Sequence, residues 1–459
     1  MWKSLRHRPV SNKSKIILTP SLWPVNADLA SKSAEFRAHV EFDGSLSMME
    51  VPFVTFRKNM TGQNKPPPDD ARYQRMSHPQ TEPLHLSGVW RMESTEQADA
   101  LLAGTATGFV YRREGHPNAS SLAEALRIVH RAEESIVTAQ GMSAISIAAM
   151  ALLKPGDRVL LGQPIYGRTS FFFKKDLARW GIEFEDVNVT DTNAWIHAFR
   201  KPSRMVIIET ITNPRLNVPD IETIARLAHQ YGGRATAESG TVVLVDNTFA
   251  TPVLCQPLEL GADLVMESLS KFVCGHADAM IGLLCGRSAV WDRIRQTMVS
   301  FGMTSSPLDC WLTQRGLASL PVRMAHAASS AFELAKSLEH HTAISLLDYP
   351  GLQSHGDNAI AKKQFNGSFG NMLTFKLRGG LRSAQRFIAA VAADIPFCPT
   401  LGEAQTTLSH PASTSHRSYS EEQLESLGIN KGTLRFSIGL EPRGWLKEKF
   451  FIGLAACGK

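Results

Sequence analysis

The chain has 459 residues, which is enough for a large buried core, and it carries a formal net charge of +6 at pH 7. Most of this charge belongs to residues 1–40, where seven Lys and Arg residues face only Asp28 and Glu35. The rest of the chain is nearly neutral, which argues against a broad basic face that binds nucleic acid.

The six cysteines are scattered, with no CxxC pair and no cluster with histidine. This spacing predicts free thiols in a reducing cytoplasm and argues against a disulfide scaffold or a metal site. No run approaches 18 apolar residues, so we expect no membrane-spanning helix.

Residues 1–80 lack clear hydrophobic periodicity and include the stretch GQNKPPPDD at 62–70. Such a composition is typical of a flexible or polyproline-like linker. We therefore expect an N-terminal extension that is disordered or only loosely ordered.

From residue 120 onwards, helical patterns alternate with short apolar strands. The strand candidates are residues 158–161, 205–209, 242–246 and 264–266. Asp220 can cap a helix in DIETIARLAHQYG, whose apolar residues recur at helical spacing. The next segment, GGRATAESG at 232–240, lengthens the connection to the following strand and suits a surface loop. The pattern predicts an α/β domain with a mainly parallel sheet.

Beyond residue 310, a long helical stretch precedes segments such as FGNMLTFKL and TLRFSIGL. These two segments alternate between apolar and polar residues as half-buried strands do. We interpret this part of the chain as a second, smaller α+β domain.

Lys271 ends an apolar strand and begins a small-residue loop, and Asp246 ends another apolar strand. A partly desolvated lysine has a lowered pKa and can condense with a carbonyl group. A carboxylate at a buried strand end needs a cationic partner, and a protonated pyridine nitrogen is one. An amine for the aldehyde and an acid for the ring nitrogen are the groups that pyridoxal 5′-phosphate (PLP) requires.

Three further patterns suit the same cofactor. Gly141 and Met142 begin an apolar helix, whose free backbone N–H groups can hold a phosphate. Tyr166 follows a strand, so its ring can stack on a flat cofactor. An ordinary turn glycine and a core tyrosine are the alternative interpretations.

Eight motifs in order resemble the Cys/Met-metabolism family of PLP enzymes, and they cover about residues 81–445. The motifs are YRREGHPN (111–118), AQGMSAI (139–145), YGRT (166–169), ETITNP (209–214), VDNTFATP (245–252), SLSKFVCGHAD (268–278), TLGEAQTTLSHPASTSH (400–416) and RFSIGLE (435–441). The resemblance implies the aspartate-aminotransferase fold. It divides the chain into an arm (81–135), a large PLP domain (136–315) and a small domain (316–459).

The resemblance also implies roles for individual residues. Lys271 binds PLP and moves the substrate proton, Asp246 holds the ring nitrogen, and Tyr166 stacks on the ring. Asn213 lies beside the phenolic oxygen of the cofactor, while Arg435 binds the α-carboxylate of the substrate and Thr400 helps to position it. The residues implied for the phosphate are Gly141, Met142, Ser268, Ser270, Tyr111 and Arg113.

Tyr111 and Arg113 are implied to reach the neighbouring subunit, where Tyr111 also assists proton transfer. The resemblance thus implies a homodimer or homotetramer with shared sites. His116 and Asn118 replace the asparagine and threonine that are usual in the family, so the details of this loop stay open.

The resemblance implies a PLP-dependent trans-sulfuration enzyme that eliminates or replaces a group on a sulfur amino acid or an activated homoserine, as a cystathionine γ-synthase or cystathionine lyase does. An O-acylhomoserine sulfhydrylase is the alternative, because two motifs differ in the activity that they favour. FVCGHAD resembles the cystathionine synthases and lyases, whereas HPASTSH resembles the acylhomoserine sulfhydrylases. Arg168 stands where methionine γ-lyases usually have cysteine, so that activity is disfavoured. The positive charge of Arg168 suits a substrate with an anionic group at its distal end. An aminotransferase and a non-catalytic PLP-binding module are more distant alternatives.

Overall fold

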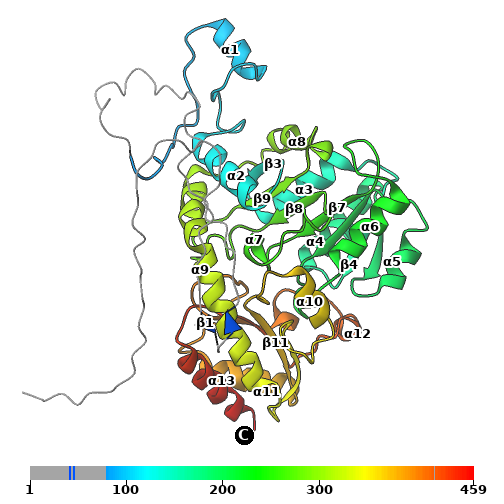
Figure 1. Cartoon of the computed structure of the whole chain (residues 1–459), viewed down its shortest axis with the longest axis vertical. Coiled ribbons are helices and arrows are strands. Elements are labelled where there is room, and N and C mark those ends of the chain that lie inside the picture. The colour runs from blue at the N-terminus through cyan, green and yellow to red at the C-terminus, as the bar shows by residue number, and fades with distance from the viewer. Residues whose placement is uncertain (1–40, 43–44, 47–78, 418, 459) are drawn as a thin grey trace, which may run out of the picture.

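The computed structural model describes residues 41–42, 45–46, 79–417 and 419–458. Most of the expected N-terminal extension lies outside these residues, apart from the antiparallel pair β1 (Glu41–Phe42) and β2 (Ser45–Leu46). The described chain forms a larger α/β part and a smaller α+β part, joined by one long helix (Figure 1).

The larger part is built on a seven-stranded sheet in the order β3-β9-β8-β7-β6-β4-β5. The strands are β3 (Glu134–Thr138), β4 (Arg158–Gln163), β5 (Glu183–Asn188), β6 (Met205–Glu209), β7 (Val242–Asp246), β8 (Leu264–Glu267) and β9 (Gly282–Gly286). Strands β4 to β8 are parallel, and β9 runs antiparallel to both of its neighbours. The predicted mainly parallel sheet is confirmed, and the four strands expected from the sequence form its centre.

The central strands are apolar on both sides because helices cover both faces of the sheet. In β7, Val243 and Val245 pack in one hydrophobic core, whereas Val242 and Leu244 pack in the other. This arrangement explains why the strand is a continuous apolar run in the sequence.

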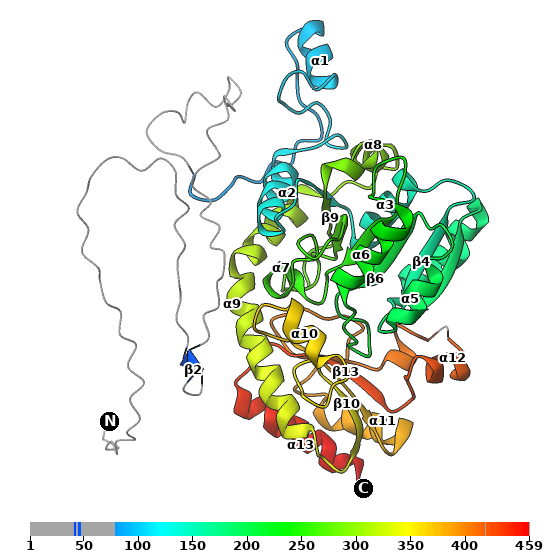
Figure 2. The same ribbon diagram turned by 45° about the vertical axis from the view of Figure 1, so that its right-hand side comes forward.

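Helices on the first face are α2 (Pro117–Val129), α5 (Thr192–Ala198), α6 (Ile221–Gly232) and α7 (Thr251–Leu254). The second face carries α3 (Gly141–Leu152), α4 (Gly167–Phe171), η2 (Phe172–Asp176), η3 (Leu177–Trp180), η4 (Ser288–Val290) and α8 (Ile294–Ser300). Figure 2 shows these layers from a second direction. The predicted cap of α6 is confirmed, since the Asp220 carboxylate accepts a hydrogen bond from the Thr223 amide at 3.0 Å.

The smaller part contains an antiparallel sheet in the order β10-β11-β13-β12. Its strands are β10 (Ile344–Asp348), β11 (Met372–Leu377), β12 (Thr407–Ser409) and β13 (Thr433–Ser437). The helices of this part are α10 (Asn358–Gln364), α11 (Gly380–Val391), η5 (Pro411–Ser413), α12 (Glu421–Ser426) and α13 (Arg443–Cys457). The core between the sheet and its helices contains a cluster of four phenylalanine rings in mutual contact, Phe375, Phe387, Phe436 and Phe450.

Helix α9 (Pro307–Leu338) runs from one part to the other. Leu317 packs in the core of the larger part, and Leu334 and Leu338 pack in the core of the smaller part. The expected domain boundary at 315/316 falls inside this continuous helix, and the division itself stays a prediction.

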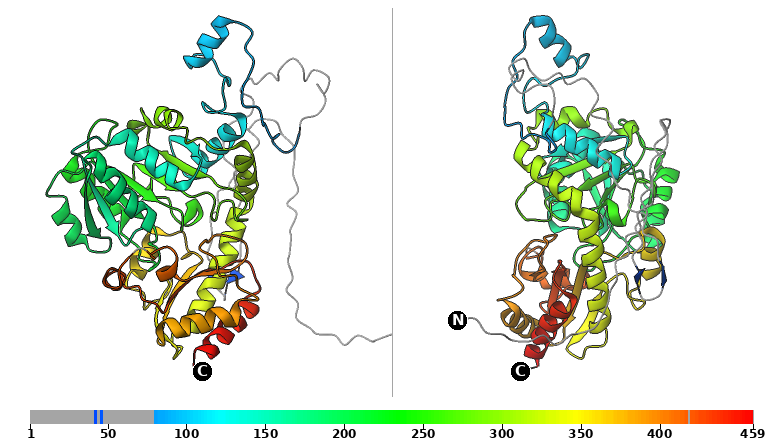
Figure 3. Two further views of the ribbon diagram at one scale, coloured as in Figure 1. Left: turned by 180° about the vertical axis from the view of Figure 1, so that it is seen from behind. Right: turned by 60° about the vertical axis from the view of Figure 1, so that its left-hand side comes forward.

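Residues before α2 contain α1 (Thr95–Leu102), which projects away from the rest of the described chain in each view (Figure 3). Helix α1 has no buried residue, and Leu102 is two-thirds exposed at 67%. This segment belongs to the arm expected at residues 81–135.

The 232–240 segment is held by a buried arginine. The Arg204 guanidinium donates hydrogen bonds to the carbonyl oxygens of Thr236, Ala237, Ser239 and Gly240, at 2.7 to 3.0 Å. Arg204 therefore fixes the conformation of this loop, which lies at the amino-terminal ends of the strands. Asp246 lies at their carboxyl ends.

The strand order predicts where a ligand binds to the large sheet. From β4 the chain moves outward to β5, and then returns to form β6 on the other side of β4. Ligands of open α/β sheets bind at such a reversal, outside the carboxyl ends of the strands. The segments that follow β4, β6, β7 and β8 meet there.

Candidate active site

The site lies where these strand ends face the smaller sheet. Tyr166 follows β4, Asn213 follows β6, Asp246 ends β7 and Lys271 follows β8. Strand β13 of the smaller part supplies Arg435. The structure thus brings together five of the predicted residues from distant parts of the sequence.

Lys271 is partly buried, and its amine donates a hydrogen bond of 3.1 Å to the hydroxyl of Thr400. Removal of water, with a smaller contribution from the positive charge of Arg435, lowers the pKa of the Lys271 amine. Glu403 acts in the opposite direction. A lysine in this state is more readily available as a neutral base than an exposed one.

Asp246 stands beside Glu209 in the parallel register of β7 and β6. The Asp246 carboxylate accepts a hydrogen bond of 2.9 Å from the Thr248 amide. Burial raises its pKa, and no ion pair to Asp246 occurs in the part of the chain that the structure describes. A cation placed outside the end of β7 would therefore stabilise the ionised form of this carboxylate.

Glu209 is a site residue that the sequence analysis missed. Its carboxylate accepts hydrogen bonds from the backbone amides of Tyr166 at 2.7 Å and Asn213 at 3.0 Å. Burial and the charge of Asp246 raise the pKa of Glu209 to about 8. The available signal was an acidic residue at the end of an apolar strand, which is the signal that identified Asp246.

Arg435 is buried in the wall of the site. Its guanidinium donates hydrogen bonds to the side-chain oxygen of Asn213 at 2.8 Å and to the carbonyl oxygen of Thr400 at 3.3 Å. Burial lowers its pKa to about 10, and its Nε is buried without a hydrogen-bond partner. A guanidinium with a free donor is suited to binding a carboxylate.

Gly141 begins α3 beside Ser268, and a Cβ atom at Gly141 would lie 2.9 Å from that of Ser268. Met142 lies in the same first turn, where no side chain caps the amides. Ser268, Ser270 and Lys271 all lie beyond the end of β8, which corrects the expectation that Lys271 ends this strand. The Ser270 hydroxyl is already bonded to the main chain of Ile281, at 2.8 and 3.1 Å.

Tyr111 and Arg113 lie in the arm, where the guanidinium of Arg113 is 5.1 Å from the Tyr111 ring centroid. Both are exposed, and no hydrogen bond within the described chain joins them to Lys271, Asp246 or Tyr166. The structure of one chain therefore does not bring these two residues into the site.

The described residues fit PLP in three respects. The first turn of α3 is uncapped beside Ser268 and can accept a phosphate. Among the described residues, Asp246 has no cationic partner and the Nε of Arg435 has no hydrogen-bond acceptor. Thr400 links the Lys271 amine to Arg435, since its hydroxyl binds the amine and its carbonyl oxygen binds the guanidinium.

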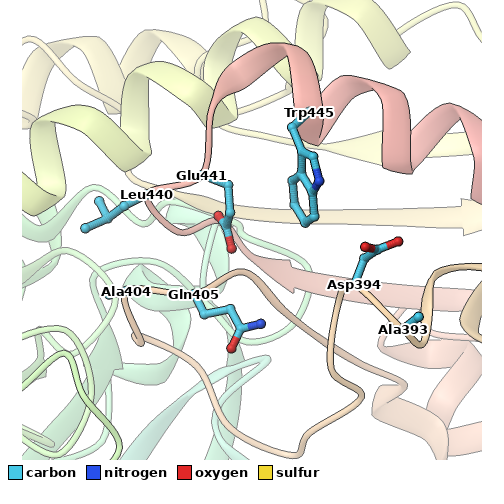
Figure 4. Close-up of a pocket in the computed structure, with 7 residues that line it drawn as sticks. All are labelled: Ala393, Asp394, Ala404, Gln405, Leu440, Glu441 and Trp445. Carbon is cyan, nitrogen blue, oxygen red and sulfur yellow. The ribbon is translucent and has the colours of Figure 1, made fainter. Parts of the chain in front are cut away.

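A surface hollow on the smaller part is separate from these residues (Figure 4). Its acidic side chains are already engaged, since Glu441 accepts a 2.7 Å bond from the Thr406 hydroxyl and Asp394 pairs with Lys449 at 2.9 Å. Within the described ranges, no cluster of His, Cys, Asp or Glu could hold a metal ion, and no helix has the length and apolarity needed to span a membrane.

Known proteins resemble this chain in both sequence and structure. Residues 69–455 match the family described as "Cys/Met metabolism PLP-dependent enzyme". An O-succinylhomoserine sulfhydrylase of Pseudomonas aeruginosa is 34% identical over 375 residues, covering 82% of this chain and 91% of the relative. An L-methionine gamma-lyase of Fusobacterium nucleatum subsp. polymorphum is 33% identical over 364 residues, covering 78% and 89%.

Among solved structures, the cystathionine gamma synthase of Xanthomonas oryzae pv. oryzae in complex with aminoacrylate and cysteine matches with a TM-score of 0.77 and 29% identity. The match covers 82% of this chain and 93% of that one. The expected type I PLP fold, the enzyme class and the cofactor are thereby confirmed. The chain belongs to the Cys/Met-metabolism family of PLP-dependent enzymes.

Proposed function

We propose that this enzyme eliminates or replaces a sulfur or oxygen leaving group at the γ carbon of an amino acid, as a cystathionine γ-synthase or cystathionine lyase does. The observation that carries the proposal is the double role of Thr400. Its hydroxyl binds the Lys271 amine, and its carbonyl oxygen binds Arg435. A substrate whose carboxylate binds Arg435 presents its α-proton to Lys271.

Residues of the larger part would hold the cofactor. Gly141, Met142, Ser268 and Ser270 bind its phosphate, with Ser270 exchanging one of its contacts to Ile281. The remaining protein contacts are the ring of Tyr166, the carboxylate of Asp246 and the amide of Asn213. Bound PLP supplies an electron sink for negative charge that develops at the substrate Cα.

The proton transfers belong to Lys271 and Tyr111. The lowered pKa of Lys271 makes its amine available to remove the α-proton. Expulsion of the γ substituent also requires loss of a proton from Cβ, which the same amine is placed to remove once it has passed the α-proton on. Arg435 and Thr400 keep the substrate carboxylate fixed throughout.

The functional unit is a homodimer or homotetramer in which neighbouring subunits share the active sites. The enzyme acts in the cytoplasm. Tyr111 and Arg113 are exposed on the arm, and within the described ranges they form no hydrogen bond to Lys271, Asp246 or Tyr166 of their own chain. In the neighbouring subunit they complete the phosphate site, and Tyr111 assists proton transfer from the substrate amine. The partners are amino-acid substrates, with no nucleic acid or membrane.

Arg168 directs the choice of substrate toward an anionic distal group. It is exposed in the first turn of α4, two residues after Tyr166, and its charge acts on the Tyr166 phenol. No carboxylate pairs with Arg168 in the ranges that the structure describes. Cystathionine and succinylhomoserine carry a distal carboxylate that can bind it, whereas methionine does not.

An acylhomoserine sulfhydrylase is the second candidate, favoured by the segment HPASTSH at 410–416. A Cβ atom at Gly167 would lie only 2.8 Å from the carbonyl oxygen of Ser415. The segment therefore packs against the start of α4, next to Tyr166. The two candidates share the same first half of the reaction and differ in the nucleophile.

The test is a product analysis of the purified protein. Cystathionine is supplied alone, and succinylhomoserine is supplied with cysteine or with sulfide, while pyruvate, 2-oxobutyrate and thioethers are measured. We expect turnover of substrates with a distal carboxylate, and Arg168→Leu should raise their KM but not that for methionine. Exposed Arg179→Leu is the matched control. Half-transamination of the cofactor without any of these products would contradict the proposal in favour of an aminotransferase, and no turnover at all would favour a binding module.

A further inference from the structure

Glu209 connects two loops that flank the site. It ends β6, and its two carboxylate oxygens accept one backbone amide each, from Tyr166 and from Asn213. Only 5% of its surface is exposed, so solvent cannot replace these bonds. The carboxylate therefore fixes the start of α4 relative to the loop after β6.

Both loops carry a side chain that faces the site. Tyr166 is the residue before α4, so its amide and its ring move together. Asn213 holds the Arg435 guanidinium at 2.8 Å, and Arg435 also binds the Thr400 carbonyl oxygen. A shift of the Asn213 backbone is thereby passed to the arginine of the smaller sheet.

A carboxylate is the group that suits this position. Both carboxyl oxygens keep a lone pair that can accept an N–H bond whether the group is ionised or protonated, whereas an amide side chain would turn its NH2 group, which cannot accept, toward one of the two donors. Glutamine at this position would satisfy one loop and repel the other. A residue that only filled space could be replaced by glutamine with little effect, because the two side chains have nearly the same volume.

We propose that Glu209 is a positioning residue that sets the stacking ring of Tyr166 and the carboxylate-binding guanidinium of Arg435 at the same time. This inference rests on the proposed roles of Tyr166 and Arg435. It predicts that Glu209 controls two separate properties of the enzyme, which are retention of PLP and recognition of the substrate carboxylate.

The experiment uses the full-length, PLP-loaded enzyme and its Glu209→Gln variant. Retention of PLP is measured by dialysis, and binding of glycine and of glycinamide is measured from the change in cofactor absorbance. Glycinamide lacks the carboxylate and serves as the internal comparison. We expect glycine binding to weaken about tenfold and glycinamide binding about twofold or less, together with faster loss of PLP. Exposed Glu183→Gln on β5 is the matched control and should leave all three values unchanged.

A double-mutant cycle tests the route through Asn213. In an Arg435→Lys background, Glu209→Gln should change glycine binding by about twofold or less, because the arginine that it positions is gone. If the Glu209 and Arg435 substitutions weakened glycine binding by independent factors that multiply in the double variant, the inference would be wrong. So would a Glu209→Gln enzyme that loses thermal stability but keeps the wild-type preference for glycine over glycinamide.

Two further outcomes are distinguished. If Glu209→Gln does not fold, Glu209→Asp is measured in the same way, and failure of both variants to fold would assign Glu209 to stability and contradict positioning. If the wild-type enzyme itself binds glycine and glycinamide equally, the proposed role of Arg435 is wrong, and the inference falls with it. A wild-type preference that is unchanged in a folded variant contradicts only the role of Glu209.

Discussion

The side-chain oxygen of Asn213 accepts a hydrogen bond of 2.8 Å from the guanidinium of Arg435, although 222 residues separate them in the chain. Asn213 lies in the loop after β6 of the larger sheet, and Arg435 lies in β13 of the smaller sheet. This bond sets the depth of the arginine in the crevice between the two sheets, where a substrate carboxylate is expected.

Arg435→Lys should raise KM for the amino-acid substrate by about tenfold to a hundredfold. A lysine keeps the charge, but it loses the planar pair of donors that matches a carboxylate. Steady-state kinetics measure the change, and exposed Arg382→Lys is the control. An unchanged KM would show that the carboxylate binds elsewhere.

Asp246→Ala should retain part of its PLP and lose at least about a hundredfold in kcat. Without the carboxylate the ring nitrogen loses its proton, and a neutral ring is a poor electron sink. Burial raises the pKa of Asp246, so a nearby cation is needed to keep it ionised. Rapid-mixing or steady-state assays at saturating PLP measure the rate, and a rate close to that of the wild type would contradict the role.

Mixing Lys271→Ala with Arg113→Ala subunits should recover activity from two inactive proteins. If each site is shared, a hybrid dimer contains one site in which both residues are intact. Subunit exchange is verified with differently tagged chains, and the recovered rate is compared with that of each variant alone. Proven exchange without recovery would place Arg113 in the site of its own subunit.

His130 should make the enzyme less stable as the pH falls from about 6.5. Burial lowers its pKa to about 3 in the folded chain, while the unfolded chain takes up a proton near the ordinary value of 6.5. The stability present above pH 6.5 is therefore lost on acidification, by up to about 1.4 kcal/mol per pH unit.

Thermal melting of the wild type and His130→Gln at pH 5 and pH 7 measures this effect. The variant should lose less stability than the wild type, whereas exposed His197→Gln should behave as the wild type does. Glu267 lies 3.6 Å from His130, and burial raises the pKa of its carboxyl, which favours its neutral form. A variant that is more sensitive to acid would indicate a charged pair instead.

The sequence predicted the parts of the fold that depend on local patterns. The apolar run of β7, the Asp220 cap of α6 and the start of α3 at Gly141 are each encoded in a few adjacent residues. The family resemblance assigned Lys271, Thr400, Asn213 and Arg435 to one site. The hydrogen bonds of Lys271 to Thr400 and of Arg435 to Asn213 are findings of the structure and were not predicted.

The remaining features depend on contacts between distant segments. Glu209 acquires its role only where the turns after β4 and β6 come together. The fastening of residues 236–240 requires the side chain of Arg204, which lies more than 30 positions earlier in the chain. No local pattern encodes such a contact.

The most direct test of the account is to find the lysine that binds the cofactor. The PLP-loaded enzyme is reduced with borohydride, digested, and analysed by peptide mass spectrometry. The account predicts a pyridoxyl-phosphate adduct on Lys271, whose amine lies in the wall of the site beside Thr400. It also predicts that Lys271→Ala carries no adduct and has no activity. An adduct on another lysine, or an active Lys271→Ala enzyme, would contradict the central assignment.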